Sequence, residues 1–186
     1  KKFGVIFEVR SSLNNNPGTI VKESSPDMEN VVVRGVSLDK NQAKVTLLNV
    51  PDHPGVAASI FQPLSAAAVN VDMKVQNVSH EDGLPVTDLS FTVEKTDLTK
   101  AQKVLNDLQQ SIGFAEMTTD ESICKLSVVG VGMKSHSGVA ARLFEVLSTE
   151  KVNILMISTS EIKISVVIEC SKGEAALKST HAAFVG

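Results

Sequence analysis

Two short segments of the sequence combine a histidine, a glycine and the expected start of a helix. Residues 52–57 read Asp-His-Pro-Gly-Val-Ala, and residues 135–140 read Ser-His-Ser-Gly-Val-Ala. Glycine lets the backbone turn tightly, and the N–H groups after it lie unpaired at the positive end of the helix dipole. Such groups bind carboxylates or phosphates. The same segments can also be ordinary connections in which Asp52 or Ser135 only caps the helix.

Polar residues follow each of these segments, in stretches that are otherwise apolar. An acidic or amide side chain there can bind an ammonium group while the loop N–H groups bind a carboxylate, and an α-amino acid carries both charges. The first stretch has acids at Asp52 and Asp72, where the second has Ser135 and Leu155. We therefore expect Asp52 and Asp72 to hold the ammonium, although Asp72 can equally be part of a solvated strand face. The polar positions are Asn70, Asp72 and Gln76, and then Asn153, Ser158, Thr159, Ser160 and Glu161.

The motifs of common catalytic and metal sites are missing from the sequence. It has no GxxxxGK[ST], GxGxxG, HExxH or CxxC pattern, and residues 130–132 lack the third glycine of a dinucleotide-binding loop. Residues 135–137 read Ser-His-Ser, but no acid is placed to orient the histidine for nucleophilic catalysis. Cys124 and Cys170 lie in apolar stretches and are expected to be small buried thiols. We therefore assign no catalytic residue, no metal site and no cofactor to this chain.

The two candidate segments belong to an internal repeat. Residues 53–79 align with residues 136–162 without a gap, at an offset of 83 residues, and 11 of the 27 positions are identical. This period is too long for a solenoid repeat and suits a small domain. The chain therefore carries two copies of one fold.

The first copy has the element order of a ferredoxin-like unit, β-α-β-β-α-β. Apolar residues at helical spacing follow residue 55, and alternating apolar residues lie before and after them. Pro63 is expected to kink or shorten the first helix, Asp97 or Thr99 to cap the second, and Gly113 to end it. The expected elements are strands at 43–50, 69–78, 86–93 and 114–118, and helices from 55 and from 97 or 99.

The second copy lacks a fourth strand of its own. Residues 31–38 form a spare strand-like segment upstream, and an open sheet edge is a liability, so we expect this segment to complete the second sheet. The first copy is then inserted in the second. The expected elements of the second copy are strands at 123–131, 152–159 and 162–169, and helices at 139–147 and 174–184.

The composition excludes several classes of protein. The net charge is −3 and the chain has no Trp, no Tyr and seven Phe, so it lacks both the basic surplus and the stacking surfaces of nucleic-acid binders. No apolar run approaches the ~20 residues that span a bilayer. The beginning of the chain does not look like a signal peptide. With only two cysteines as well, we expect a reduced, cytoplasmic protein that binds neither nucleic acid nor membrane.

Several long motifs resemble the tandem ACT regulatory region of aspartate kinase. They read PDHPGVAASIF, NVDMKVQNVS, VVGVGMKSHSGVAARLFEVL and NILMISTSEIKISVVI, and the resemblance covers residues 31–186. Residues 3–20 resemble the segment that closes the kinase domain of that family. The resemblance implies an α+β fold of two ferredoxin-like ACT domains. ACT domain 1 spans 39–119, ACT domain 2 spans 31–38 plus 120–186, and residues 1–30 are the end of a kinase domain and a linker.

The resemblance implies a regulatory role, in a part of an aspartate kinase or in its separate β subunit. In that family the kinase domain, which uses ATP and Mg, phosphorylates the β-carboxylate of aspartate in lysine, threonine and methionine biosynthesis. The ACT pair binds threonine and/or lysine for feedback inhibition, and ACT domains of different chains face one another. The implied partners are therefore a second copy, in a homodimer, or a kinase-containing α chain, in a heterotetramer. The implied effector-binding residues are Asp52, His53, Pro54, Gly55, Val56, Ala57, Asn70, Val71, Asp72, Gln76, Val139, Ala140, Asn153, Ile154, Ser160 and Glu161.

Three other interpretations explain less of the sequence. The ACT pair can serve another biosynthetic enzyme, such as a dehydrogenase, but residues 3–20 favour a kinase. A tandem RNA-binding module has the same element order, but it needs aromatic residues on the middle strands and a basic face. Residues 123–131 contain no aromatic residue. A stand-alone enzyme on this scaffold needs an acid–base or metal cluster, which the sequence does not offer.

Overall fold

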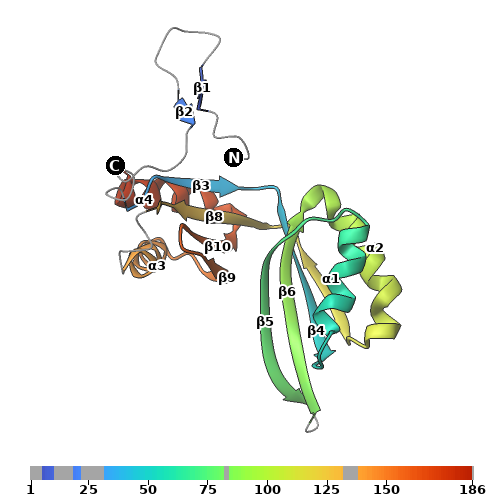
Figure 1. Cartoon of the computed structure of the whole chain (residues 1–186). Helices are drawn as coiled ribbons and strands as arrows, with labels where there is room; N and C mark the ends of the chain where they lie inside the picture. Colours follow the sequence, from blue (N-terminus) through green and yellow to red (C-terminus); the bar gives the residue numbers. More distant parts are fainter. Residues whose placement is uncertain (1–5, 11–18, 22–31, 82–83, 132–137, 186) are drawn as a thin grey trace.

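The computed structural model describes residues 6–10, 19–21, 32–81, 84–131 and 138–185 (Figure 1). Within these ranges the chain forms a short hairpin and two four-stranded antiparallel sheets, each with two helices on one face. We refer to the sheet that contains β4 and its helices as unit one, and to the sheet that contains β8 and its helices as unit two. This α+β architecture of two similar units confirms the fold expected from the repeat.

Unit one has the order β-α-β-β-α-β that the first copy predicts. Its sheet order is β5-β6-β4-β7, so the two strands that flank the first helix lie apart, with β6 between them. The elements are β4 (Gln42–Pro51), α1 (Val56–Ala66), β5 (Val71–Glu81), β6 (Leu84–Glu94), α2 (Lys95–Ile112) and β7 (Glu116–Asp120).

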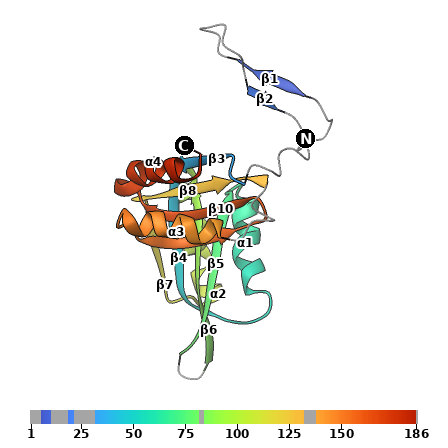
Figure 2. The same cartoon turned by 90° about the vertical axis from the view of Figure 1, so that its left-hand side faces the viewer.

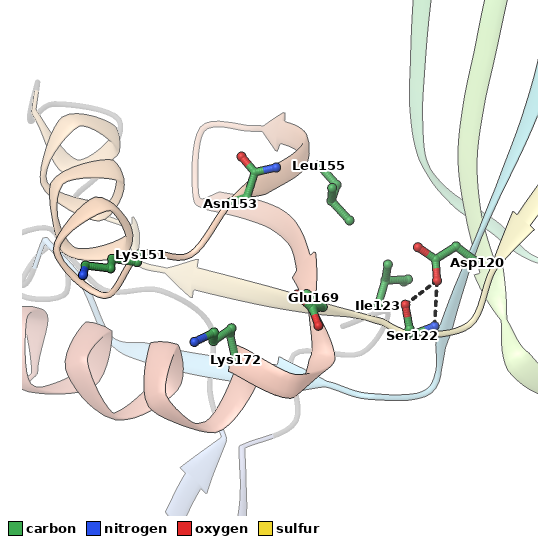
Figure 3. A pocket seen from close by; sticks show the side chains of 8 residues that line it. All are labelled: Asp120, Ser122, Ile123, Lys151, Asn153, Leu155, Glu169 and Lys172. Carbon is green, nitrogen blue, oxygen red and sulfur yellow. Dashed lines mark hydrogen bonds between the residues drawn. The ribbon is translucent and has the colours of Figure 1, made fainter.

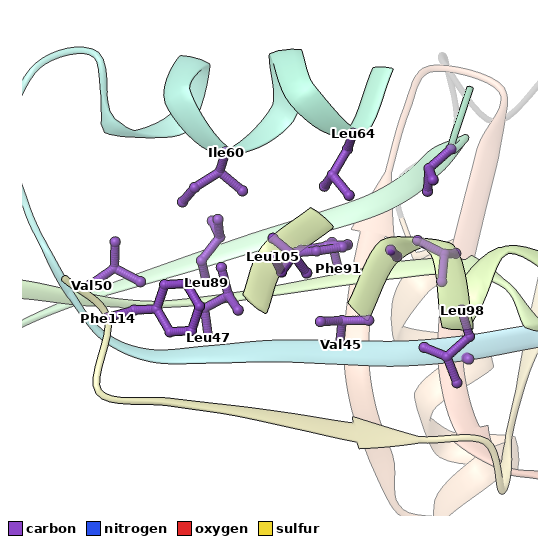
Figure 4. Packing of buried hydrophobic residues seen from close by; sticks show 14 of the residues in the cluster. Val45, Leu47, Val50, Ile60, Leu64, Leu89, Phe91, Leu98, Leu105 and Phe114 are labelled. Carbon is purple, nitrogen blue, oxygen red and sulfur yellow. The ribbon is translucent and has the colours of Figure 1, made fainter. Parts of the chain in front are cut away.

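The core of unit one lies between its sheet and its two helices (Figure 4). Alternate residues of β4 up to Leu47 face α1 and α2, and Val45 and Leu47 are fully buried there. Ile60 and Leu64 of α1 are also fully buried. Burying a side chain of this size stabilises the fold by about 1.5–3 kcal/mol. The core therefore fixes the position of α1, and with it the loop before the helix.

Unit two is completed by a strand from the N-terminal side of unit one. β3 pairs antiparallel with β8, with Gly35 opposite Val129 and Asp39 opposite Lys125, which confirms the pairing expected for residues 31–38 from residue 35 onward. Figure 2 shows α3 and α4 side by side over this sheet, whose order is β3-β8-β10-β9. The elements are β3 (Gly35–Asp39), β8 (Ile123–Val129), α3 (Val139–Thr149), β9 (Ile154–Thr159), β10 (Lys163–Glu169), the 3₁₀-helix η3 (Cys170–Lys172) and α4 (Gly173–Phe184).

The two units repeat unusual backbone features at equivalent positions. Gly55 and Gly138 precede the first helix of each unit with φ values of 97° and 101°. Ala68 and Lys151 follow that helix in the left-handed region, at 54° and 53°. The next strand has a register shift in both units, near residues 71–74 in β5 and opposite residues 167 and 168 in β9. The internal repeat therefore extends to backbone conformation.

Two local expectations in unit one are wrong, namely the shortening of α1 by Pro63 and the capping of α2 by Asp97 or Thr99. Pro63 does not shorten α1, because α1 and α3 both have 11 residues. The carbonyl that the Pro63 nitrogen cannot bond belongs to the exposed Ser59, where water can reach it. α2 begins at Lys95, directly after β6, so Asp97 lies inside its first turn and pairs with Lys100 at 3.0 Å. Gly113 ends α2 in the left-handed region, as expected.

In the N-terminal segment, the apolar residues 3–9 predict one strand, and residues 11–18, which are rich in Ser, Asn, Pro and Gly, predict a loop. β1 (Phe7–Val9) lies within the strand expected at 3–9, and it pairs antiparallel with β2 (Thr19–Val21), which the sequence did not reveal. The expected loop at 11–18 lies outside the described residues. Ile6, Val9 and Ile20 expose their side chains on this hairpin. No helix in the described ranges is long and apolar enough to cross a membrane.

The two units contact each other through a small apolar cluster, which we name the inter-unit cluster. Met73 and the half-buried Val75 from β5 of unit one meet three fully or almost fully buried residues of unit two. These three residues are Ile123, Met156 and Val167. The contact lies on the sheet faces that the helices do not cover, because Ile123 and the core residue Cys124 point to opposite faces of β8.

Candidate functional site

The loop between β4 and α1 presents backbone N–H groups at the start of a helix. Gly55 has a φ of 97° and is the last residue before α1, which has no side-chain cap. Asp52 is therefore not the helix cap, and its own N–H donates a 3.0 Å hydrogen bond to the Pro85 carbonyl. The Val56 N–H donates a 3.2 Å hydrogen bond to the His53 carbonyl, whereas the N–H groups of Ala57 and Ala58 have no acceptor within the helix. They are available to a negatively charged ligand group.

Gln76 on β5 joins this loop. Its Nε2 lies 3.5 Å from Asp52 Oδ1, so the amide and the carboxylate meet beside the start of α1. We name this group the loop cluster. It consists of Asp52, Gly55, Val56, Ala57 and Gln76. His53 and Pro54 are exposed next to it, and His53 Nδ1 lies 3.2 Å from the Pro54 carbonyl oxygen.

Asp72 is not part of the loop cluster. Gln76 lies four positions further along β5, which is about 13 Å in an extended strand. The sequence-based prediction that Asp52 and Asp72 hold one ammonium group is therefore not supported by the geometry. Asn70 and Val71 lie next to Asp72 at the beginning of β5, so these three residues form a second, separate place.

The carboxylate of Asp72 binds Lys125 of unit two. Burial raises the pKa of the Asp72 carboxyl, but the hydrogen bond and charge of Lys125 lower the pKa more, with further lowering by the charges of Lys163 and Lys74. The net result is a pKa below the ordinary value of 3.8, so Asp72 is ionised at neutral pH. No pattern in the sequence indicates this partner, because residue 125 lies far from residue 72 along the chain.

Unit two shows the same separation into two places. Val139 and Ala140 begin α3 directly after Gly138, whereas Asn153 and Ile154 lie at the beginning of β9. Ser160 lies in the turn after β9, where its N–H donates a 2.8 Å hydrogen bond to the Lys163 carbonyl. Glu161 is exposed in the same turn. Ser135 and His136 of the second candidate segment lie outside the described residues.

Asn153 also lines a pocket of about 250 Å³ near the junction of the two units (Figure 3). Sequence reasoning missed the other lining residues, because they come from several separate elements. Asp120 accepts hydrogen bonds from the Ser122 hydroxyl at 2.5 Å and from the Ser122 N–H at 2.8 Å, which lower the pKa of its carboxyl. The lining residues are Asp120, Ser122, Ile123, Lys151, Asn153, Leu155, Glu169 and Lys172.

The described residues contain no group of three or more His, Cys, Asp or Glu side chains that could hold a metal ion. The two cysteines are free thiols, Cys124 buried and Cys170 half-buried. Burial, with the neighbouring Cys170, raises the pKa of the Cys124 thiol to about 12. Because the thiolate is the reactive form of cysteine, Cys124 is a poor nucleophile.

The ACT domain family matches residues 48–109 and 126–184 of this chain. An aspartate kinase of Pseudomonas fluorescens is 45% identical over 184 residues, which are 98% of this chain and 44% of that protein. The chain thus spans less than half the length of the curated relatives it matches.

Two solved structures are similar over most of their own length. One is of aspartokinase α and β subunits, with 46% identity and a TM-score of 0.75, and the match covers 82% of this chain and 98% of that chain. The other is the ligand-free regulatory subunit of aspartate kinase from Thermus thermophilus, with 39% identity and a TM-score of 0.76, covering 82% and 99%.

Proposed function

This chain belongs to the ACT-domain family and, within it, to the regulatory regions of aspartate kinases, and from this premise we propose that it binds a free amino acid that controls a kinase. The observation that carries this proposal is the loop cluster. It combines helix N–H groups, which suit a carboxylate, with the carboxylate of Asp52, which suits an ammonium group.

The loop cluster fits one α-amino acid. The ligand carboxylate binds the N–H groups at Ala57 and Ala58, because the Val56 N–H already donates to the His53 carbonyl, and the ligand ammonium binds Asp52. Gln76 can turn its amide toward a polar side chain of the ligand, since its contact with Asp52 is long at 3.5 Å. Threonine, with a hydroxyl group, and lysine, with a second ammonium group, are the effectors we propose.

The candidate residues at the beginning of β5 and β9 lead us to include a second chain in this proposal. β5 and β9 each pair with one strand only in the described part of the chain, so each has an unpaired edge. Leu155 and Ile157 of β9 are exposed apolar residues at such an edge. We propose that unit one of one chain covers unit two of another, in a homodimer or with a kinase-containing α chain, and that effectors bind in this interface.

The activity of the complete protein is part of the proposal. We propose that the protein to which this chain belongs phosphorylates aspartate with ATP and Mg in the cytoplasm, in the biosynthesis of lysine, threonine and methionine. Nucleotide and Mg are assigned to a kinase domain and not to residues of this chain. The exposed Ile6, Val9 and Ile20 on the β1–β2 hairpin support a role for this segment as the end of such a domain, which would cover them.

Calorimetric titration of the 186-residue chain with threonine, with lysine and with both together tests the proposed site. Charge-assisted hydrogen bonds contribute about 1.5–3 kcal/mol, so we expect Asp52→Asn to weaken binding roughly ten- to a hundredfold. Asp107→Asn, on an exposed position of α2, is the matched control and should leave the affinity unchanged. If neither amino acid binds the unmodified chain, or if Asp52→Asn binds normally, the proposed site is wrong.

A further inference from the structure

Lys125 connects the two units through one carboxylate on each side. Its Nζ binds Asp72 of unit one and lies 3.7 Å from Asp39 Oδ2 of its own unit. Asp39 lies directly opposite Lys125 in the β3–β8 pair, and it also accepts a hydrogen bond from the Gln42 side chain at 2.8 Å. Lys125 is therefore held in unit two whether or not it contacts Asp72.

This ion pair lies at the rim of the inter-unit cluster. Asp72 directly precedes Met73, and Lys125 lies on the same face of β8 as Ile123, two residues away. Asp72 is at the register shift of β5, where the strand leaves the regular ladder and the carboxylate turns toward unit two. A change at Asp72 therefore acts on the contact that sets how the two units lie relative to each other.

The two side chains differ in exposure, and this difference favours replacement of Lys125 by a ligand at Asp72. Asp72 keeps 45% of its side chain exposed, whereas Lys125 keeps only 12%. A ligand in solvent can thus approach the carboxylate without first displacing the lysine stem. The Lys125 Nζ is a primary ammonium group, the same chemical group that an α-amino acid presents, so the two are direct competitors for one carboxylate.

We propose that Lys125 is an internal competitor for a second amino-acid ligand, which binds at Asp72, and that the ammonium group of this ligand takes the place of Lys125. This inference rests on the proposed function and concerns the place at the beginning of β5, not the loop cluster. Displaced from Asp72, Lys125 keeps Asp39 as its partner, and the units lose their ion pair. Ligand binding is thereby coupled to the arrangement of the units, because a ligand shifts a conformational equilibrium only through its different affinities for the two states.

Substitution of Lys125 tests the competition. Lys125→Met keeps an unbranched stem of similar length beside the inter-unit cluster and removes the ammonium group. We expect lysine or threonine to bind this variant about two- to fivefold more tightly, the range that corresponds to a partly exposed ion pair. Lys125→Arg keeps the charge and strengthens the contact with Asp72, so it should bind the ligand more weakly than the unmodified chain.

Lys163→Met is the matched control, because Lys163 lowers the pKa of Asp72 through its charge alone. If competition is the mechanism, Lys163→Met tightens binding less than Lys125→Met does. Circular dichroism and thermal melting establish whether each variant is folded. If Lys125→Met is not folded, the affinity of Lys125→Arg tests the competition. The inference is overturned if both Lys125 variants bind as the unmodified chain does while Asp52→Asn still weakens binding. If the unmodified chain binds neither threonine nor lysine, the proposed function is contradicted instead.

Discussion

Residues of the same type have different roles in this chain because their neighbours differ. Asp52 meets the amide of Gln76 beside free helix N–H groups, which leaves its carboxylate available to a ligand. Asp72 is bound by Lys125, so any ligand must compete for it. Asp120 accepts hydrogen bonds from the hydroxyl and N–H groups of Ser122 and so stabilises the turn between the units. The position of an acid in the repeat therefore does not decide its chemistry.

The Asp72–Lys125 ion pair predicts a pH-dependent contribution to stability. The pKa of Asp72 is lower in the folded chain than its ordinary value of 3.8, so its contribution is present above pH 3.8 and disappears as the pH falls through the folded pKa. We expect Asp72→Asn to melt at a lower temperature than the unmodified chain at pH 5–7, and the difference to shrink below about pH 3.8. Thermal melting by circular dichroism measures this difference. A gap of the same size at pH 3 and pH 7 would contradict it, and Asp107→Asn controls for the loss of a carboxylate.

At the scale of elements, the repeat made most of the fold predictable. Apolar periodicity and the 83-residue offset indicated both βαββαβ units, and the missing strand of the second copy indicated the role of residues 31–38. β2 was missed because three residues give no periodicity. The partner of Asp72 and the pocket near Asp120 were also missed. Both depend on how unit two packs against unit one, and side chains from separate elements leave no local pattern in the sequence.

The chain that leads into β3, the strand that completes unit two, makes a close backbone contact with Gly130. A Cβ added at Gly130 would lie 2.0 Å from the Val32 carbonyl oxygen, closer than any real contact. Backbone cannot move aside as a flexible side chain can, so we expect Gly130→Ala to displace the chain that enters β3. The expected loss is about 1–3 kcal/mol in the free energy of unfolding, the usual range for overpacking.

Urea denaturation measures the loss, and hydrogen exchange of the β3 amides locates it. Gly35→Ala is the matched control in the same strand pair, because nothing lies within 4 Å of a Cβ added there. Equal stability of the two variants, with normal protection of β3, would show that the contact at Gly130 is not required.

At the scale of the whole molecule, each unit has one group of candidate ligand-binding residues that the other unit of the same chain does not cover. The loop cluster of unit one offers groups for both charges of an amino acid, but its Gly55, Ala57 and Gln76 are exposed to solvent. The beginning of β9 in unit two, with Asn153 and Ile154, offers polar and backbone groups at an unpaired edge. Within one chain the units meet through the inter-unit cluster instead, which turns other faces toward each other. The proposed second chain would cover these exposed groups.

This arrangement predicts that ligand binding and assembly are linked. If an amino acid lies between two chains, its binding favours association, and association raises its affinity by the same factor. We expect Ile157→Lys, which places a charge at the exposed edge of β9, to weaken dimer formation and to weaken threonine or lysine binding with it. Val185→Lys is the matched control, because Val185 is similarly exposed, at 42% against 44%, but lies at the end of α4. Light scattering with and without ligand measures the assembly. A chain that stays monomeric at saturating threonine and lysine, or an Ile157→Lys variant that dissociates yet binds ligand normally, would place the site within a single chain.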